Sequence, residues 1–471
     1  MLFRPLSVLF LVETDLGLVS LSFLALRWDA ERTRHAESHM ARRPMEPETE
    51  TVRILQTGGS FPTSCHAQRT KTPMRFSQVL VYTPNLAVPV SNALVYITGR
   101  PPEGIPDGVY CPDCVPLDCP NEDAILTAAD GSFSLSTESG TGKYLVVQKG
   151  QFLRISPVDI EVGDTALDIA LTSLPGQWNP DGGEWTPRIA VAAGEFDRLE
   201  DALGKLGLGE TDIVNWEERL VGGTAKFAFY ENGYAVSGDG HTSLGTLADL
   251  VSDPAELAKY HIIFIPCGNG VVDGVLTPEN IQNIRDWVEA GGRWYVADWS
   301  GEFIDQVFPE YQTFYKDGGG SLDLESYDAI GTSTDAALMA WLDAIPEGLK
   351  DINPLNDEND HPTLTHLPGI PTVDNWSGIE STPYVIVNDP VYGAVNLGHR
   401  TWLETTTGNF GEIPSGTSHP LTVTAQYGCG RLQFTSYHAA EFENYVGLSP
   451  QELVLIDTIL EIGMCVPAPP T

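Results

Sequence analysis

Short apolar runs separated by turn residues dominate the chain from Val79 to about Leu174. Runs of this length that alternate with polar residues and end at Gly, Asn or Asp are typical of strands. Asp130-Gly131 lies between two runs and predicts a hairpin, because both residues of such a turn need positive φ. The pattern predicts an all-β sandwich. Its expected strands are Ser91–Ile97, Ala124–Ala128, Ser132–Ser136, Tyr144–Gln148 and Ala166–Leu171.

The pattern changes after a linker rich in Pro and Gly, Pro175–Pro187. From Arg188 onward, fully apolar runs alternate with amphipathic stretches, which predicts a flavodoxin-like α/β domain with a parallel sheet. The expected strands are Ile189–Ala193, His261–Ile265, Trp294–Ala297 and Arg431–Ser436. The expected helices are Asp197–Leu206, Ile281–Glu289 and Pro450–Ile462, the last with Ser449 as N-cap.

Residues 311–420 interrupt this alternation and are expected to form a cap over the sheet. Within them Leu338, Trp341, Leu342 and Ile345 fall at helical spacing and predict an apolar packing face. The predicted organisation is a leader or misassigned start (1–75), a β-sandwich (76–174), a linker (175–187) and an α/β domain (188–471) that carries the cap.

The net charge of the chain limits the kinds of molecule that it is expected to bind. The chain has 471 residues and a formal net charge of −38. Nucleic-acid phosphates and anionic membranes require Lys and Arg, so both are excluded as partners. The acidic surface suits either simple solvation or the holding of divalent ions, as in an adhesive surface protein. No cofactor is expected, and the oligomeric state is left open.

The first 75 residues differ from the rest, with ten basic and eight acidic side chains. Their apolar runs Leu6–Val12 and Leu16–Leu26 are broken by Glu13 and Asp15, so neither a clean signal peptide nor a membrane span is predicted. Their composition is typical of a disordered leader.

Cysteines offer several alternatives. The motif CPDCVPLDC holds Cys111, Cys114 and Cys119, which suits either one local disulfide with a spare thiol or a zinc site that lacks its fourth ligand. Cys429 and Cys465 are the other disulfide candidates, and a bond between them would imply an oxidising compartment. The expected location is therefore secreted, periplasmic or on the cell surface.

Candidate chemistry gathers after the predicted strands, because ligands of open α/β sheets bind at the carboxyl ends. One segment is PCGNG, another is the turn at Asp298–Gly301, and the third is SYHAAE after a late strand. The predicted ligand pocket is Gly194, Cys267, Gly268, Asn269, Asp298, Trp299 and His438. The acidic loop with Asp357 and Asp360 is a weak calcium candidate, because it lacks the EF-hand spacing.

Two resemblances add to this reading. NALVYI and AILTAADGSFSLS resemble carboxypeptidase regulatory-like domains, which are transthyretin-like sandwiches that act as spacers or binding platforms. The cysteine insertion after Val109 is similar to a variant in secreted proteins of some Gram-negative predatory bacteria.

The α/β part resembles the class I glutamine amidotransferase-like superfamily, including its trehalose-utilisation-type branch. IIFIPCGNG resembles the glycine loop, YVADWSGEF the nucleophile elbow and QFTSYHAAE the late strand of that family. The resemblance implies that His438 and Glu441 are the counterparts of the family's His and Glu. Trp299 falls where the family's cysteine is expected, which implies that the nucleophile is lost.

Two other nucleophiles are considered. Ser300 could act with a histidine and an acid, although a shift of one residue at a sharp turn points its side chain elsewhere. Cys267 could pair with His438, although a buried thiol is commonly inert. The leading hypothesis is a non-enzymatic, exported binding or surface protein, with carbohydrate or cell-surface material as ligand. The alternative is a hydrolase or carbohydrate-modifying enzyme that uses the cleft around Cys267, Ser300 and His438.

Overall fold

The computed structural model describes residues 74–75, 79–111, 124–163, 167–215, 217–268, 272, 274–350, 367–389, 393–409, 411–440 and 445–462. All of them belong to the second of the two units into which the chain divides, Gly59–Thr471. The predicted leader lies outside the described residues, apart from the short strand β1 at its end.

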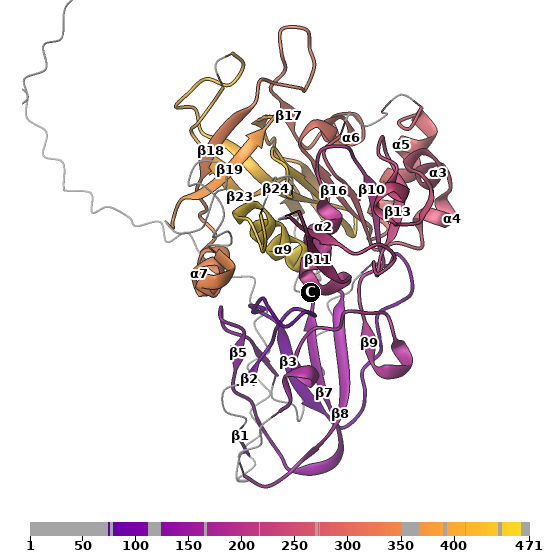
Figure 1. Cartoon of the computed structure of the whole chain (residues 1–471), viewed down its shortest axis with the longest axis vertical. Coiled ribbons are helices and arrows are strands. Elements are labelled where there is room, and N and C mark those ends of the chain that lie inside the picture. The colour runs from indigo at the N-terminus through magenta and orange to yellow at the C-terminus, as the bar shows by residue number, and fades with distance from the viewer. Residues whose placement is uncertain are drawn as a thin grey trace, which may run out of the picture. The chain divides into compact units, whose positions relative to one another are not determined.

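Antiparallel strands fill the region before the predicted linker and extend into it, because the last strand of the sheet, β9, lies within residues 175–187 (Figure 1). One sheet has the order β4 (Ala124–Leu126), β3 (Leu94–Thr98), β7 (Gly140–Lys149), β8 (Phe152–Ile160) and β9 (Glu184–Trp185). Two further ladders join β2 (Val79–Leu80) to β5 (Ser132–Phe133) and β1 (Met74–Arg75) to β6 (Ser136–Thr137). The all-β character of this region agrees with its hydrophobic pattern, and a two-sheet sandwich stays a prediction.

Two local expectations for this region were wrong. Gly131 adopts φ 76° in a tight turn, but β4 pairs with β3 and β5 with β2, so Asp130-Gly131 does not join a hairpin. The expected strand Ala166–Leu171 was also wrong, because the residues from Ile169 onward form a short helix, α1 (Ile169–Thr172). Its start is fixed by Asp168, whose carboxylate accepts a hydrogen bond from the backbone N–H of Ala170.

An eight-stranded sheet forms the centre of the α/β part. Its order is β14 (Ser243–Thr246), β13 (Ala228–Glu231), β10 (Ile189–Ala193), β15 (Ile262–Ile265), β16 (Arg293–Ala297), β25 (Gly430–Thr435), β24 (His419–Tyr427) and β23 (Arg400–Thr405). The pairs from β14 to β25 are parallel, and β24 and β23 are antiparallel. The α/β class predicted from the sequence agrees with these parallel strands.

Helices pack on both faces of this sheet, and alternate residues of each strand face opposite layers. Val191 and Phe264 belong to one apolar cluster, together with side chains of α2 (Leu199–Leu203) and α9 (Pro450–Ile462). Ala192 and Ile263 belong to a second cluster, with side chains of α3 (Leu247–Ser252) and α5 (Pro278–Glu289). Two-sided burial explains why the central strands read as unbroken apolar runs.

Helix ends follow their capping residues. Thr277 accepts a hydrogen bond from the N–H of Asn280 at the start of α5. At the start of α9, Ser449 and Glu452 cap each other's backbone N–H groups, as a capping box does. The remaining helical elements are α4 (Pro254–Leu257), α6 (Glu302–Asp305), α7 (Ala336–Ala344), α8 (Glu347–Lys350), η1 (Pro180–Gly182), η2 (Gly204–Leu208), η3 (Val236–Asp239) and η4 (Asp298–Gly301).

The region 311–420 contributes β23 to the main sheet and otherwise forms short ladders. These are β17 (Thr313–Phe314) with β20 (Ile379–Ser381), β18 (Tyr327–Gly331) with β19 (Ile370–Asn375), and β21 (Ile386–Asp389) with β22 (Gly393–Asn396). Outside it, β11 (Thr211–Val214) pairs with β12 (Glu217–Leu220). Leu338, Trp341 and Leu342 of α7 are buried, as their helical spacing predicts.

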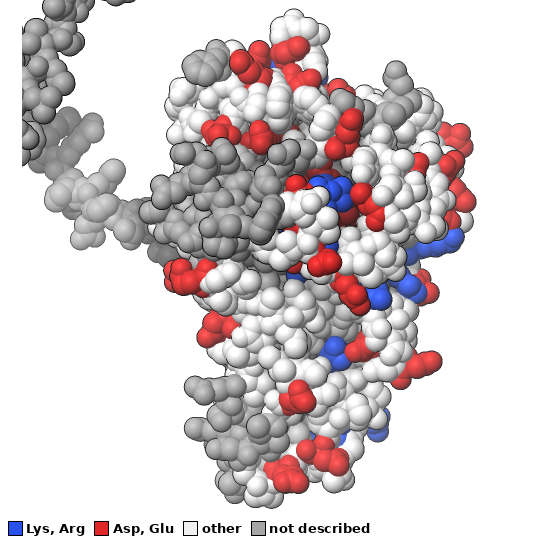
Figure 2. Space-filling model, viewed as in Figure 1, with Lys and Arg blue, Asp and Glu red and all other residues white. Residues whose placement is uncertain are grey.

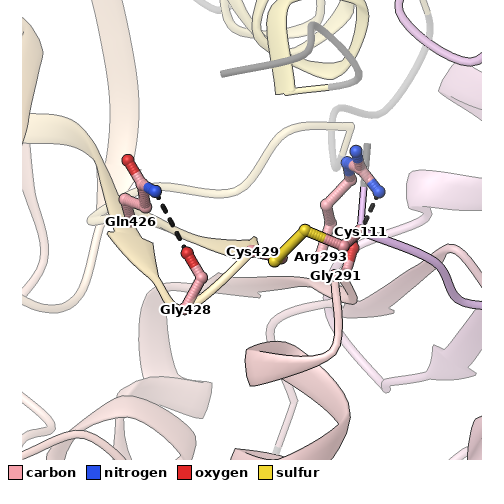
Figure 3. Close-up of a disulfide and its surroundings, with 6 residues drawn as sticks. All are labelled: Cys111, Gly291, Arg293, Gln426, Gly428 and Cys429. Atoms are coloured by element: carbon pink, nitrogen blue, oxygen red, sulfur yellow. Dashed lines mark hydrogen bonds between the residues drawn. A yellow bond between two sulfur atoms is a disulfide. The ribbon is translucent and has the colours of Figure 1, made fainter. Parts of the chain in front are cut away.

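A disulfide joins Cys111 to Cys429, 318 residues apart (Figure 3). The sequence had suggested that Cys111 forms a local bond within CPDCVPLDC and that Cys429 pairs with Cys465. Both expectations were wrong, because Cys111 and Cys429 pair with each other. Cys429 lies in the turn between β24 and β25, where its N–H donates to the carbonyl of Glu289 at the end of α5. The bond therefore links the segment after β3 to the turn between β24 and β25 of the α/β sheet.

Acidic side chains are scattered over the face shown in Figure 2, and basic ones are fewer. The distribution agrees with the strongly negative net charge of the sequence. Among the described residues, no helix is both long enough and apolar enough to cross a membrane.

Replacing Cys111 and Cys429 together by serine is expected to lower the free energy of unfolding by roughly 2–4 kcal/mol, because the cross-link restricts the unfolded chain. Urea unfolding in non-reducing buffer measures the difference, after peptide mapping has verified the bond. Reductant should destabilise the wild type more than the double variant. Equal unfolding midpoints for the two proteins without reductant would contradict the prediction.

Candidate functional site

The carboxyl ends of the parallel strands meet at one edge of the sheet. The strand order reverses at β10, because the later strands β13 and β15 lie on opposite sides of it. Open α/β sheets bind ligands at such a switch point. Gly194 ends β10 so close to β15 that a Cβ there would lie 2.4 Å from the carbonyl oxygen of Cys267. A glycine is required at this point because the two backbones touch.

The turn after β16 is strained at Asp298. Its φ is 47°, in the left-handed region that non-glycine residues seldom adopt. A strand-to-helix turn with one strained residue is the geometry that presents a nucleophile in elbow motifs. The family resemblance had implied Trp299 at this position, whereas the strained residue of the turn is Asp298.

Three side chains converge beside this turn. The Nε2 atom of His438 lies 3.0 Å from Oδ2 of Asp298, and Sγ of Cys267 lies 3.9 Å from the same oxygen. The three donor atoms all lie within 4.8 Å of one another. Each comes from the end of a different strand: Cys267 follows β15, Asp298 follows β16 and His438 follows β25.

This thiol–carboxylate–imidazole cluster of Cys267, Asp298 and His438 is enclosed. The first two residues are 0% exposed and His438 is 4% exposed. Burial, followed by the charge of Asp298, raises the pKa of the Cys267 thiol to about 12. Burial also raises the pKa of Asp298, while the hydrogen bond and charge of His438 lower it. Without a further cation, the thiol is therefore protonated at neutral pH.

The other candidates at the turn, Ser300 and Trp299, contact neighbouring parts of the fold. The hydroxyl of Ser300 donates to the carbonyl of Pro266 at 2.7 Å, so it points toward the β15 loop. Trp299 is half-buried, with its ring edge-on to Phe196 at 5.3 Å and to Trp376 at 5.2 Å. Trp299 therefore belongs to an aromatic group beside the cluster.

Residues outside the sequence-based list hold the cluster in place. The N–H of Trp376, after β19, donates to both carboxylate oxygens of Asp298 at 3.1 and 3.3 Å. The buried carboxylate of Asp197 accepts hydrogen bonds from the N–H groups of Ala439 and Ala440 at 3.1 and 3.0 Å. These bonds fix the backbone that follows His438.

Gln451 of α9 extends this support. Its amide nitrogen donates to the carbonyl of His438, and it exchanges hydrogen bonds with the backbone of Val373 in β19. No motif in the sequence pointed to Trp376, Asp197 or Gln451, because their partners are distant in the chain. The candidates Asn269, Glu441, Cys114, Cys119, Cys465, Asp357 and Asp360 lie outside the described residues.

A pocket of about 410 Å³ opens at the same sheet edge, beyond β13 and β14. We call it the edge pocket; it is lined by residues 231–235, 246–248 and 274–275. Asn232 lies in its wall and is 3% exposed. Among the described residues, neither polar atom of this side chain has a hydrogen-bond partner. The hydrophobic pattern did not predict β13, so it gave no indication of this pocket.

No protein-family model matches the sequence, and no curated protein matches it. Similar solved structures include a cytoplasmic protein from Salmonella typhimurium, at 11% identity and a TM-score of 0.27 over 48% of this chain and 83% of that one.

Two further similar structures are a ThuA-like protein from Bacteroides uniformis and PurLQS from Thermotoga maritima. The first has 10% identity and a TM-score of 0.27, and covers 48% of this chain and 78% of its own. The second has 10% identity and a TM-score of 0.30, and covers 58% of this chain and 98% of its own. At these values the matches carry no argument about activity.

Asp197→Ala is expected to destabilise the protein by roughly 3 kcal/mol, because it leaves two buried N–H groups without their acceptor. Asp197→Asn keeps an oxygen acceptor and should cost less. Urea unfolding measures the stability, and hydrogen exchange should show faster exchange at Ala439 and Ala440 in the alanine variant. Unchanged exchange at both amides would refute the positioning role of Asp197.

Proposed function

We propose that the chain is a non-enzymatic, exported binding protein that takes a carbohydrate or a similar polyhydroxylated ligand in the edge pocket. The observation that carries the proposal is Asn232. A buried amide without partners costs free energy, so its presence in a pocket wall favours a ligand that completes its hydrogen bonds.

The chemistry of the edge pocket supports this ligand class. An amide offers both a donor and an acceptor, and each sugar hydroxyl can also donate and accept. Glu231 adds a half-buried carboxylate, and Tyr234 adds an aromatic ring whose hydroxyl is engaged by Asp239 at 2.7 Å. The volume of about 410 Å³ lies within the roughly 300–1,000 Å³ of small-molecule sites.

The absence of catalysis is proposed from geometry. A nucleophile must contact its substrate, whereas the side chains of Cys267 and Asp298 are 0% exposed. The hydroxyl of Ser300 donates a hydrogen bond to a backbone carbonyl. The elbow-like turn therefore supports an amidotransferase-like scaffold whose strained position holds a buried acid in place of a reactive thiol.

One observation favours the alternative, a hydrolase. Cys267 and His438 do converge, with Asp298 between them, which is the set of groups that a thiol-dependent hydrolase uses. Under this alternative, His438→Ala would abolish turnover of an ester, amide or glycoside substrate while the protein stays folded. Turnover of none of these substrates by the wild type would exclude it.

Export and the role of the first domain complete the proposal. The Cys111–Cys429 disulfide supports an oxidising compartment, because such bonds are rare in reducing ones. The antiparallel strands β2 to β8 support a regulatory-like sandwich that acts as a spacer. We propose that this sandwich presents the α/β domain at the cell surface or outside the cell.

Asn232→Leu is expected to weaken sugar binding by about 10- to 100-fold, because two hydrogen bonds to the ligand are lost at about 1 kcal/mol each. A glycan array with the full chain identifies a sugar, and calorimetry measures its affinity. The proposal fails if the array shows no bound glycan or if Asn232→Leu binds as tightly as the wild type.

Gln312→Leu provides a matched control. Gln312 is also buried, and its amide has no hydrogen-bond partner within the described part of the chain, but it does not line the edge pocket. Both substitutions remove an unsatisfied polar group, so both variants are expected to fold with near-normal stability. Only Asn232→Leu should lose affinity, and equal losses in both variants would point to a general structural effect.

A further inference from the structure

The enclosed cluster of Cys267, Asp298 and His438 combines three kinds of donor atom. Sulfur, carboxylate oxygen and imidazole nitrogen face one another within 4.8 Å. The Nε2 atom of His438 lies 3.0 Å from the carboxylate of Asp298. Cys267 is the free cysteine found among the described residues, and it is buried beside these two side chains.

We infer that this cluster binds one zinc ion, with Cys267, Asp298 and His438 as its protein ligands. A thiolate, a carboxylate and a neutral imidazole carry two negative charges, which Zn²⁺ balances in a site closed to bulk solvent. Metal binding explains why all three groups are buried together, because the free energy of binding the ion offsets the cost of desolvating its ligands.

The ligand set selects the class of metal. Thiolate and imidazole favour zinc and related transition metals over calcium and magnesium, which prefer oxygen ligands. Zinc bonds of about 2.0–2.3 Å place tetrahedral ligands roughly 3.3–3.8 Å apart. The 3.0 and 3.9 Å separations from Asp298 Oδ2 bracket this range, so small side-chain rotations would complete the geometry. A water molecule could take the fourth position.

The surrounding hydrogen bonds suit a metal centre. The N–H of Trp376 holds the carboxylate of Asp298, as outer-shell donors orient the ligands of metal sites. Gln451 and Asp197 hold the backbone at His438 and just after it. The inference goes beyond the proposed function, because none of the three ligands lines the edge pocket.

The test uses the full chain, purified without chelator and dialysed. Elemental analysis should find close to one zinc per chain. After removal of zinc, added Co²⁺ should give a near-ultraviolet thiolate-to-cobalt charge-transfer band, which a protein without a cysteine ligand does not show. Zinc should also raise the melting temperature of the metal-free protein, because the ion binds only the folded state.

Cys267→Ser and Asp298→Asn conserve size and should weaken zinc binding by more than the roughly 10–100-fold that loss of an outer-shell partner costs. His241→Gln is the matched control, since His241 is a buried histidine outside the cluster, and it should keep full affinity. The cobalt band must also disappear in Cys267→Ser and persist in His241→Gln.

Absence of bound zinc, of a cobalt band and of any stabilisation of the wild type would overturn the inference, whatever the variants do. A cobalt band that survives in Cys267→Ser would overturn the assigned ligands. The outcome is separable from that of the sugar experiment. Asn232→Leu should retain zinc, and failure of sugar binding would leave the metal result unchanged.

Discussion

A buried carboxylate needs partners, and Asp298 is one that the fold encloses completely. It occupies a left-handed backbone position at the end of β16, which costs conformational energy that its surroundings must offset. Its partners come from distant parts of the chain: the N–H of Trp376, the imidazole of His438 and the nearby thiol of Cys267. The ends of three strands and the region 311–420 therefore meet at this carboxylate.

The sheet edge is divided into two environments. On one side of β10, the cluster around Asp298 is closed to solvent; on the other, the edge pocket is open and carries the unsatisfied amide of Asn232. The division follows from the strand order, because β13 and β14 lie on one side of β10 whereas β15, β16 and β25 lie on the other. A closed polar cluster suits an ion, whereas an open pocket suits a ligand that enters from solvent.

Much of the α/β scaffold could be predicted from hydrophobic pattern. Strands β10 and β15 are unbroken apolar runs, and β16 is one after Arg293, because both of their faces are covered by helices. Strands β13 and β14 were missed, since AFYE and SLGT at the sheet margin lack such runs. The edge pocket was missed with them, because its wall begins where β13 ends.

The sequence by itself determined the apolar periodicity, the helix caps and the presence of Cys267, Asp298 and His438 after strands, all of which depend on neighbours within a few residues. Only the tertiary structure decided that Asp298, one residue before Trp299, holds the strained turn. It also decided that Cys111 pairs with Cys429 across 318 residues. Such contacts depend on how strands order themselves in the sheet, and local sequence does not encode which distant segments will meet.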